Sequence, residues 1–200
     1  AAGQADAVVL VLGESADMSG EAAARSSLEL PGRQLGLAEA VMAAGKPTVA
    51  VLMNGRPLAL GQLAASVPAI LEAWFPGTEG GRALADVLFG DVPPGGKLPM
   101  TFPRSVGQVP IYYAHKNTGR PSDPANKYTS KYIDGPDTPL FPFGYGLSYT
   151  SFALSDLRLD ASTVAPDGLL RVSVTLENTG ARTGDETVQV YIRDLAADVT

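Results

Sequence analysis

Three short, largely apolar segments constrain the fold of this chain more than any other feature. They occupy residues 6–13, 47–53 and 69–74. Such runs are typical of strands covered on both faces, as in a parallel sheet. Apolar residues recur near helical spacing between and after these runs, which predicts helices over residues 31–44, 58–65 and 78–89. Because the predicted strands and helices alternate with short connections, the sequence predicts a parallel-sheet α/β sandwich.

The sequence changes character twice after this region. Pro, Gly and aromatic residues crowd the stretch from residue 91 to residue 150, which predicts an extended, loop-rich segment that packs on neighbouring domains. Beyond it, alternating apolar residues predict antiparallel strands over residues 152–160, 170–177 and 186–192. A complete sandwich needs about seven strands, so a truncated β-sandwich is predicted. The predicted domains are residues 1–110 (α/β sandwich), 111–150 (interdomain segment) and 151–200 (β-sandwich strands).

Composition excludes several functions. The chain has no cysteine, which rules out disulfides, thiol catalysis and cysteine metal sites. The net charge of −6 and the lack of a basic stripe argue against a nucleic-acid partner. No window approaches the roughly 20 apolar residues that span a membrane. A single histidine and scattered acids indicate neither a metal site nor a cofactor. The first residues have neither a positive n-region nor an apolar h-region, so no signal peptide is expected there, and both ends are expected to be cuts within a longer protein.

The strongest candidate for a functional site follows the first predicted strand. In parallel α/β sheets, ligands bind beyond the carboxyl ends of the strands. Here that end is Gly13-Glu14, followed by a small, polar loop over residues 15–29 that carries several acids, among them Glu21, and one base, Arg25. A carboxylate on such a loop can be directed at a substrate, although the loop could equally be a solvated one that caps the next helix.

Other chemistries find less support. The chain has no G-x-S-x-G motif, and its lone His115 has no nucleophile motif beside it, which argues against a serine hydrolase. Residues 77–81 (GTEGG) open a predicted helix where an anion could bind, but they match neither a Walker A motif nor a dinucleotide fingerprint. A free-standing flavodoxin-like domain that binds a phosphorylated ligand has only this turn in its favour.

Five stretches, in order, resemble glycoside hydrolase family 3 β-glucosidases. The first three resemble the second catalytic domain of that family: VLGESADMSGEAAARSSLELPGRQLGL, KPTVAVLMNGRPLAL and AILEAWFPGTEGGRALADVLFGDVPPGGKLPMTFPRSVGQVPIYY. FPFGYGLSYTSF and ENTGARTGDETVQVYI are similar to the junction into the family's fibronectin type III-like domain. The resemblance covers nearly the whole chain and is strong for the bacterial periplasmic members.

The resemblance implies how the catalytic groups are divided. In this family an N-terminal β/α barrel, absent from this sequence, supplies an Asp nucleophile, and the α/β sandwich supplies a Glu general acid/base. By position in the MSGE stretch, this role falls on Glu21. Glu14 is the second candidate for the acid/base. Its other interpretation is a structural carboxylate that accepts hydrogen bonds from the amides of the loop. Many relatives have Asp where this chain has Ala24, which leaves the hydrogen bonding of the loop open.

Further residues receive roles from position and resemblance. Arg25 either tethers the acidic loop or orients the sugar, and Asn54 follows the second strand, where residues 54–57 are expected to line the cleft. Lys97 and Arg104 are expected to anchor the aromatic segment. The predicted site therefore has Glu21 as acid/base, Arg25 and Asn54 as candidate sugar contacts, and no metal.

The resemblance implies a retaining exo-β-glucosidase that acts without a cofactor. Its expected partners are β-linked oligosaccharides or aryl glucosides and the barrel of the same protein, in the periplasm or outside the cell. Relatives that remove xylose or N-acetylglucosamine leave the sugar open. The piece alone is expected to be inactive, because the nucleophile lies elsewhere. The alternative is a non-catalytic carbohydrate-binding or scaffolding module from a truncated gene.

Overall fold

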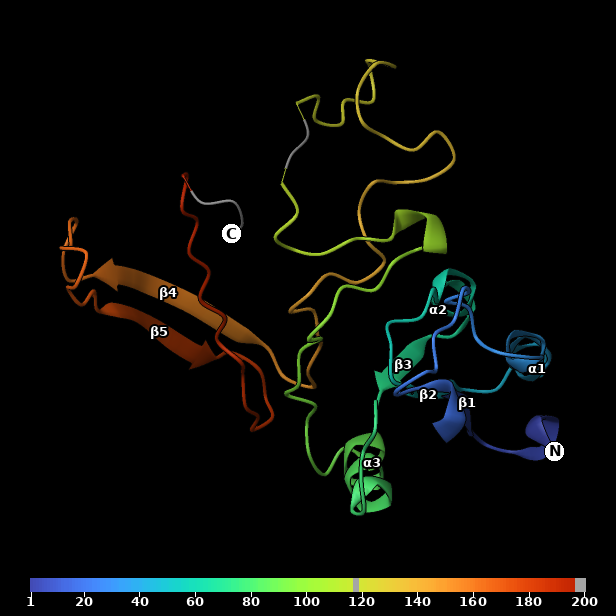
Figure 1. Cartoon of the computed structure of the whole chain (residues 1–200). Helices are drawn as coiled ribbons and strands as arrows, with labels where there is room; N and C mark the ends of the chain where they lie inside the picture. The colour runs from blue at the N-terminus through green and yellow to red at the C-terminus, as the bar shows by residue number, and fades with distance from the viewer. Residues whose placement is uncertain (117–118, 197–200) are drawn as a thin grey trace. The chain divides into compact units, whose positions relative to one another are not determined.

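The computed structural model describes residues 1–116 and 119–196 (Figure 1). These residues form two compact units. The first contains residues 1–84 and 98–145 together with the described residues from 190 onward, and the second contains residues 85–97 and 146–189.

The first unit is built on a parallel sheet of three strands in the order β1-β2-β3. The strands are β1 (Val8–Gly13), β2 (Thr48–Met53) and β3 (Ala69–Glu72). Along the chain they alternate with the helices α1 (Gln34–Met42), α2 (Gly61–Ser66) and α3 (Gly80–Phe89), of which residues 85–89 belong to the second unit. Short 3-10 turns occupy Ala2–Gln4, Ala16–Met18 and Val106–Gln108. The predicted parallel α/β arrangement is confirmed.

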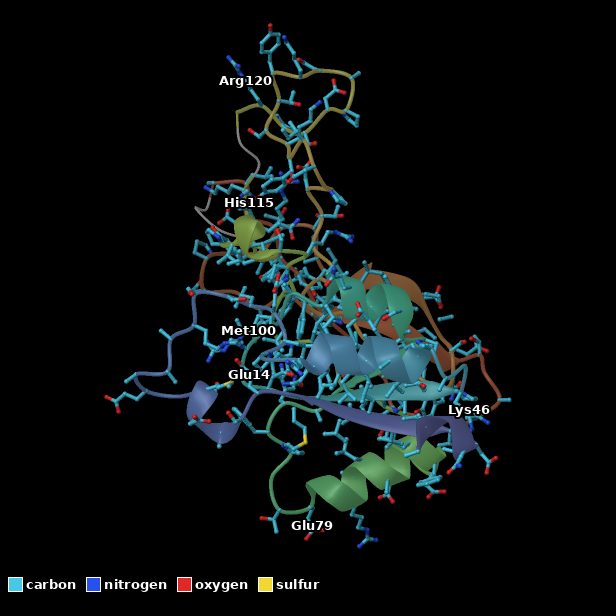
Figure 2. The ribbon with its side chains drawn as sticks, turned by 90° about the vertical axis from the view of Figure 1, so that its right-hand side faces the viewer. Glu14, Lys46, Glu79, Met100, His115 and Arg120 are labelled. Atoms are coloured by element: carbon cyan, nitrogen blue, oxygen red, sulfur yellow. The ribbon has the colours of Figure 1, made fainter. Side chains whose placement is uncertain are left out.

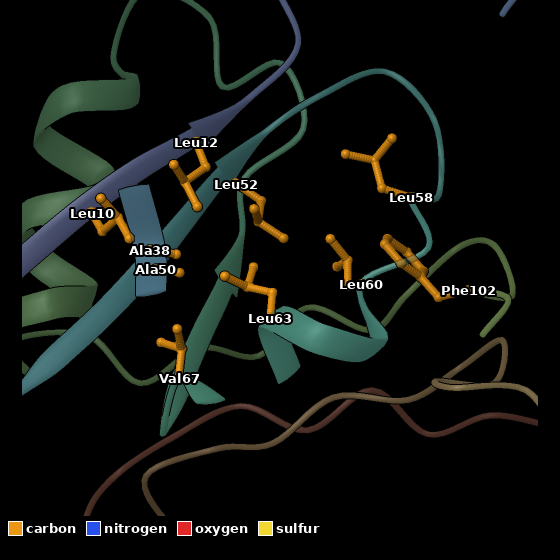
Figure 3. Packing of buried hydrophobic residues seen from close by; sticks show 10 residues of the cluster. All are labelled: Leu10, Leu12, Ala38, Ala50, Leu52, Leu58, Leu60, Leu63, Val67 and Phe102. Atoms are coloured by element: carbon orange, nitrogen blue, oxygen red, sulfur yellow. The ribbon is translucent and has the colours of Figure 1, made fainter. Parts of the chain in front are cut away.

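The core of this unit lies between the sheet and the helices α1 and α2, as Figure 3 shows. Its buried members are Leu10, Leu12, Ala38, Ala50, Leu52, Leu58, Leu60, Leu63, Val67 and Phe102. Each fully buried Leu or Phe of this kind contributes roughly 1.5–3 kcal/mol relative to leaving it in water. The central strand β2 is buried over most of its length, which explains its uninterrupted apolar run.

Strand β1 differs from its prediction on one face. Leu10 and Leu12 are buried, whereas Val9 and Val11 on the opposite face are 53% and 58% exposed. β1 is an edge strand of this sheet. Cover on both faces, which its sequence predicts, is therefore present on only one face within the described part of the chain.

The segment from residue 98 to residue 145 folds back onto the same core. Phe102, only 1% exposed, forms an isolated antiparallel bridge with Phe141, and its amide donates to the Phe141 carbonyl at 2.8 Å. Leu98 N–H donates to Tyr145 O at the same distance, so the two arms of the loop are held together at their base. The described residues of this segment, 98–116 and 119–145, contain one 3-10 turn and no long helix or strand, as predicted.

Polar side chains fasten this segment further. Arg104 Nε donates to Thr138 O at 2.9 Å, and the buried Gln108 amide donates to Pro136 O and Thr138 O while accepting from Arg104 N–H. Lys97 Nζ, in the second unit, donates to Gly146 O at 2.9 Å. Arg104 therefore anchors this segment, as predicted, whereas Lys97 holds Gly146, near the end of the predicted 111–150 segment, within the second unit.

The second unit contains an antiparallel pair, β4 (Phe152–Leu159) and β5 (Val172–Asn178), with a register shift between Ser155 and Arg158. The predicted third strand over residues 186–192 is wrong: no strand follows β5 in the described residues. Glu186 instead pairs with Lys97 at 2.9 Å, and Thr187 Oγ1 donates to Gly95 O at 3.2 Å. Apolar alternation identified a possible strand, but these contacts hold the start of the segment against another part of the chain.

Candidate active-site loop

The three parallel strands end along one edge of the sheet, and the candidate residues follow those ends. Glu14 follows β1, Asn54 to Arg56 follow β2, and Glu72 ends β3. Figure 2 shows Glu14 and Lys46 at opposite ends of the sheet, as the register of β1 on β2 requires. This edge is where ligands bind in open α/β sheets.

The end of β1 is fixed by Gly13 and the side chain of Gln34. Gly13 has a φ of 139°, and a Cβ at this position would lie 1.9 Å from Met53 O, so only glycine fits. Gln34 Oε1 accepts from Gly13 N–H, and Gln34 Nε2 donates to Gly13 O, both at 2.7 Å. The loop therefore leaves the sheet from a fixed point.

Glu14 is the centre of a buried ion cluster. Its side chain has no exposed surface, and its carboxylate lies 2.6 Å from Arg25 Nη1 and 2.9 Å from Arg56 Nε. It also accepts from Gly55 N–H at 3.3 Å. A buried carboxylate is tolerated when it is paired and hydrogen-bonded in this way.

These contacts determine the protonation of Glu14. Burial alone would raise the pKa of its carboxyl, but the hydrogen bonds from Arg25, the Gly55 amide and Arg56 together outweigh burial and hold the pKa below its ordinary value. A proton donor near neutral pH needs the opposite shift. The geometry of Glu14 thus favours its structural interpretation over the acid/base role.

Arg25 lies within the loop as a tether. Its Nη1 contacts Glu14, and its Nη2 donates to Glu29 O at 3.0 Å. Its side chain is 19% exposed. Both of these hydrogen bonds are internal to residues 14–29, which favours the tether over the sugar contact as the role of Arg25.

Glu21 occupies an exposed turn at the far side of the same loop. Ala23 N–H donates to Gly20 O at 3.3 Å, which closes the turn, and Ala22 has a φ of 59°. The turn is held from outside by Arg56, whose Nη2 donates to Met18 O and, at 3.1 Å, to Ala23 O. Glu21 is therefore presented outward on a turn whose backbone is anchored on both sides.

Asn54, the other predicted sugar contact, is completely buried. Its Nδ2 donates to Arg56 O at 2.9 Å and contacts Glu72 Oε2 at 3.4 Å. Its Oδ1 has no hydrogen-bond partner among the described residues. In this arrangement Asn54 joins the ends of β2 and β3 and offers no surface to a sugar, so its predicted contact requires a rearrangement.

Two residues of this edge received no individual role from the sequence. Arg56 lies in the expected cleft segment but carries no motif of its own. Glu72 is an acid in an otherwise apolar strand, AILEAW. This exception is the sequence signal that could have identified Glu72 as a site residue. Burial raises the pKa of Glu72 to about 7, although hydrogen bonds from Trp74 N–H and Asn54 oppose the rise.

The raised pKa of Glu72 predicts a stability that falls as pH rises. The folded protein keeps this proton between its ordinary value of 4.5 and about 7, whereas the unfolded chain releases it, so the free energy of unfolding decreases across that window. The full difference corresponds to roughly 3 kcal/mol. Thermal unfolding of the full-length protein between pH 4.5 and 7.5 should show that Glu72→Gln flattens this dependence, while Glu39→Gln on the exposed face of α1 leaves it in place. Equal slopes for Glu72→Gln and wild type would contradict the prediction.

Within the described residues, no group of three or more His, Cys, Asp or Glu side chains could hold a metal ion. None of the described helices is long and apolar enough to cross a membrane.

Comparison of the whole chain with known proteins identifies its family. The model of the glycosyl hydrolase family 3 C-terminal domain matches residues 1–149. The chain is similar to a periplasmic β-glucosidase of Salmonella typhimurium, with 55% identity over 202 residues, and to a β-xylosidase of Formosa agariphila, with 49% identity over 199 residues. Both alignments cover 100% of this chain but only 26% and 27% of the relatives, so the chain spans about a quarter of their length.

Solved structures agree with the sequence relatives. A β-glucosidase from Listeria innocua in complex with glucose matches with a TM-score of 0.74 and 39% identity, over 91% of this chain and 30% of that one. A β-glucosidase from Erythrobacter marinus matches with a TM-score of 0.81 and 45% identity, over 92% and 24%. The fold thus defines a domain of the glycoside hydrolase class. The chain belongs to glycoside hydrolase family 3 and contains its C-terminal domain.

Proposed function

We propose that the full-length protein is a retaining exo-β-glucosidase and that this segment supplies its general acid/base, Glu21. The observation that carries the proposal is the contrast between two carboxylates on one loop. Glu14 is buried and paired with two arginines, whereas Glu21 is exposed on an anchored turn at the edge of the sheet where ligands bind. An Asp nucleophile on an upstream β/α barrel would complete the site.

The chemistry requires two carboxyl groups about 5–5.5 Å apart. The nucleophile attacks the anomeric carbon as the bond to the departing oxygen breaks, and Glu21 gives its proton to that oxygen. In the second step, Glu21 takes a proton from water, the water oxygen bonds to the anomeric carbon, and the nucleophile is released.

A general acid that begins this cycle protonated near neutral pH needs a raised pKa, which burial or the negative charge of the nucleophile can provide. Glu21 is exposed in this segment. We therefore propose that the rest of the protein supplies the environment in which Glu21 acts. We accordingly propose that the segment alone is inactive.

Glucose is proposed as the terminal sugar because several relatives are named β-glucosidases and one solved relative is in complex with glucose. The β-xylosidase name of another relative makes xylose the main competitor. The proposed substrates are oligosaccharides with a terminal β-linked glucose and aryl glucosides. The proposed reaction uses no cofactor. The name of the Salmonella typhimurium relative supports a periplasmic location.

Stereochemistry and sugar preference test this function in the full-length protein. With an aryl β-glucoside, proton NMR should show β-glucose as the first product, before mutarotation, because two inversions give retention. The kcat/KM for the aryl β-glucoside should exceed that for the matching xyloside. Initial release of α-glucose would overturn the retaining mechanism. Sugar binding without any turnover would support the carbohydrate-binding module instead.

A further inference from the structure

We propose that Arg56 is a positioning residue for catalysis: its guanidinium holds the carbonyls of Met18 and Ala23 and thereby fixes the direction in which the turn presents Glu21. This inference rests on the proposed acid/base role of Glu21. It assigns a role in catalysis to a residue that follows β2, on a different part of the chain from the loop itself.

The first support is the position of the two carbonyls. Both accept hydrogen bonds from the same nitrogen, Arg56 Nη2, and they lie on either side of Glu21 in the chain. A shift of the guanidinium would therefore move both ends of the turn. The turn's own hydrogen bond, between Ala23 N–H and Gly20 O, is 3.3 Å long. It joins two residues of the turn to each other and does not attach the turn to the sheet.

The second support is that Arg56 is itself firmly placed. Its Nε contacts the buried Glu14 carboxylate at 2.9 Å, and its carbonyl accepts from Asn54 Nδ2 at 2.9 Å. Pro57 follows it and restricts the backbone. A planar guanidinium can bind a carboxylate through one nitrogen and carbonyls through another, which a lysine ammonium at a single point cannot reproduce.

The third support is steric. A Cβ on Gly55 would lie 2.0 Å from Ser19 Oγ and 2.8 Å from Ser19 Cβ. The loop therefore packs directly against the backbone beside Arg56, immediately before the turn that carries Glu21. The hydrogen bonds of Arg56 and the close packing of Gly55 thus hold the same turn against residues 55 and 56.

Arg25 provides a contrast within the cluster. It also contacts Glu14, but its second hydrogen bond goes to Glu29 O, beyond the turn. Loss of either arginine should weaken the Glu14 cluster, whereas only loss of Arg56 should release the carbonyls beside Glu21. A purely structural role for Arg56 would make the two variants alike.

The test compares Arg56→Lys with Arg25→Lys in the full-length enzyme on aryl β-glucosides of graded leaving-group pKa. Arg56→Lys should lower kcat/KM about 100-fold for poor leaving groups, the scale of a displacement of about 1 Å, and little for activated ones that need no proton. Arg25→Lys should show a weaker dependence on the leaving group at a comparable change in Tm. Arg82→Lys, on the exposed face of α3, is the unchanged control.

Gly55→Ala offers a second route to the same displacement if Arg56→Lys does not fold. It keeps both arginines and crowds Ser19 on one side and Phe75 on the other, and through Ser19 it should steepen the leaving-group dependence in the same way. The proposal is overturned if folded Arg56→Lys and Gly55→Ala lose activity equally on all leaving groups, or lose none. If Glu21→Gln itself lacks the leaving-group dependence, the proposed function fails; if only the Arg56 and Gly55 variants lack it, this inference alone fails.

Discussion

Replacement of Glu21 by Gln in the full-length enzyme is expected to lower kcat/KM by about 10²–10⁴-fold on aryl β-glucosides with poor leaving groups. Gln has nearly the same shape but no proton to give, so the departing oxygen must leave as an anion. An activated leaving group, such as dinitrophenolate, needs no such help. Its kcat/KM should stay near the wild-type value, while its kcat falls because the glycosyl-enzyme waits for a water that no base activates.

The matched control is Glu29→Gln, which alters an exposed acid of the same loop. Its kinetics should follow wild type for every leaving group. Glu14→Gln is expected to differ from both, because it removes the charge that two arginines surround, and should lower the unfolding midpoint of the protein. A loss of activity in Glu21→Gln that is the same for good and poor leaving groups would contradict the acid/base role.

Phe102→Ala is expected to destabilise the protein by about 3–5 kcal/mol, the usual cost of removing a buried aromatic ring. Phe102 is 1% exposed, and its ring lies 5.6 Å from that of Trp74 and 6.4 Å from that of Phe141, measured between centroids. Its loss would leave a cavity where the 98–145 segment meets the core.

Urea unfolding of the full-length protein, followed by intrinsic fluorescence and circular dichroism, measures this effect. Tyr128→Ala removes a ring from the same segment at a position that is 68% exposed, and should change stability by less than about 0.5 kcal/mol. If the two variants have similar midpoints, the view that Phe102 fastens this segment to the core is wrong.

The parallel sheet could be predicted because its strands carry their burial in their own sequence. Leu10, Leu12 and Leu52 belong to runs that are almost entirely apolar, which few structures other than a covered strand accommodate. The exposure of Val9 and Val11 could not be predicted. An apolar run indicates that both faces of the strand need to be buried, but it does not show whether residues of this chain bury them. The prediction of a third sandwich strand failed for a related reason. Alternating apolar residues show that a segment could form one face of a sheet, but the contacts of Glu186 with Lys97 and of Thr187 with Gly95 hold this segment elsewhere.

The candidate site divides in the same way. The position of Glu14 and Glu21 on one loop beyond a strand was predictable from the sequence. Their different environments were not, because the partners of Glu14 include Gly55 and Arg56, about forty residues away along the chain. The raised pKa of Glu72 likewise depends on burial that an isolated sequence letter does not reveal.

The most direct test of the central proposal, that Glu21 is the acid/base, is azide rescue of Glu21→Gln with an activated aryl β-glucoside. Azide attacks the glycosyl-enzyme without needing a base, so kcat should rise with azide concentration and the product should be β-glucosyl azide. Wild type and Glu29→Gln should gain nothing. If azide leaves the kcat of Glu21→Gln unchanged and glucose remains the sole product, Glu21 is not the acid/base.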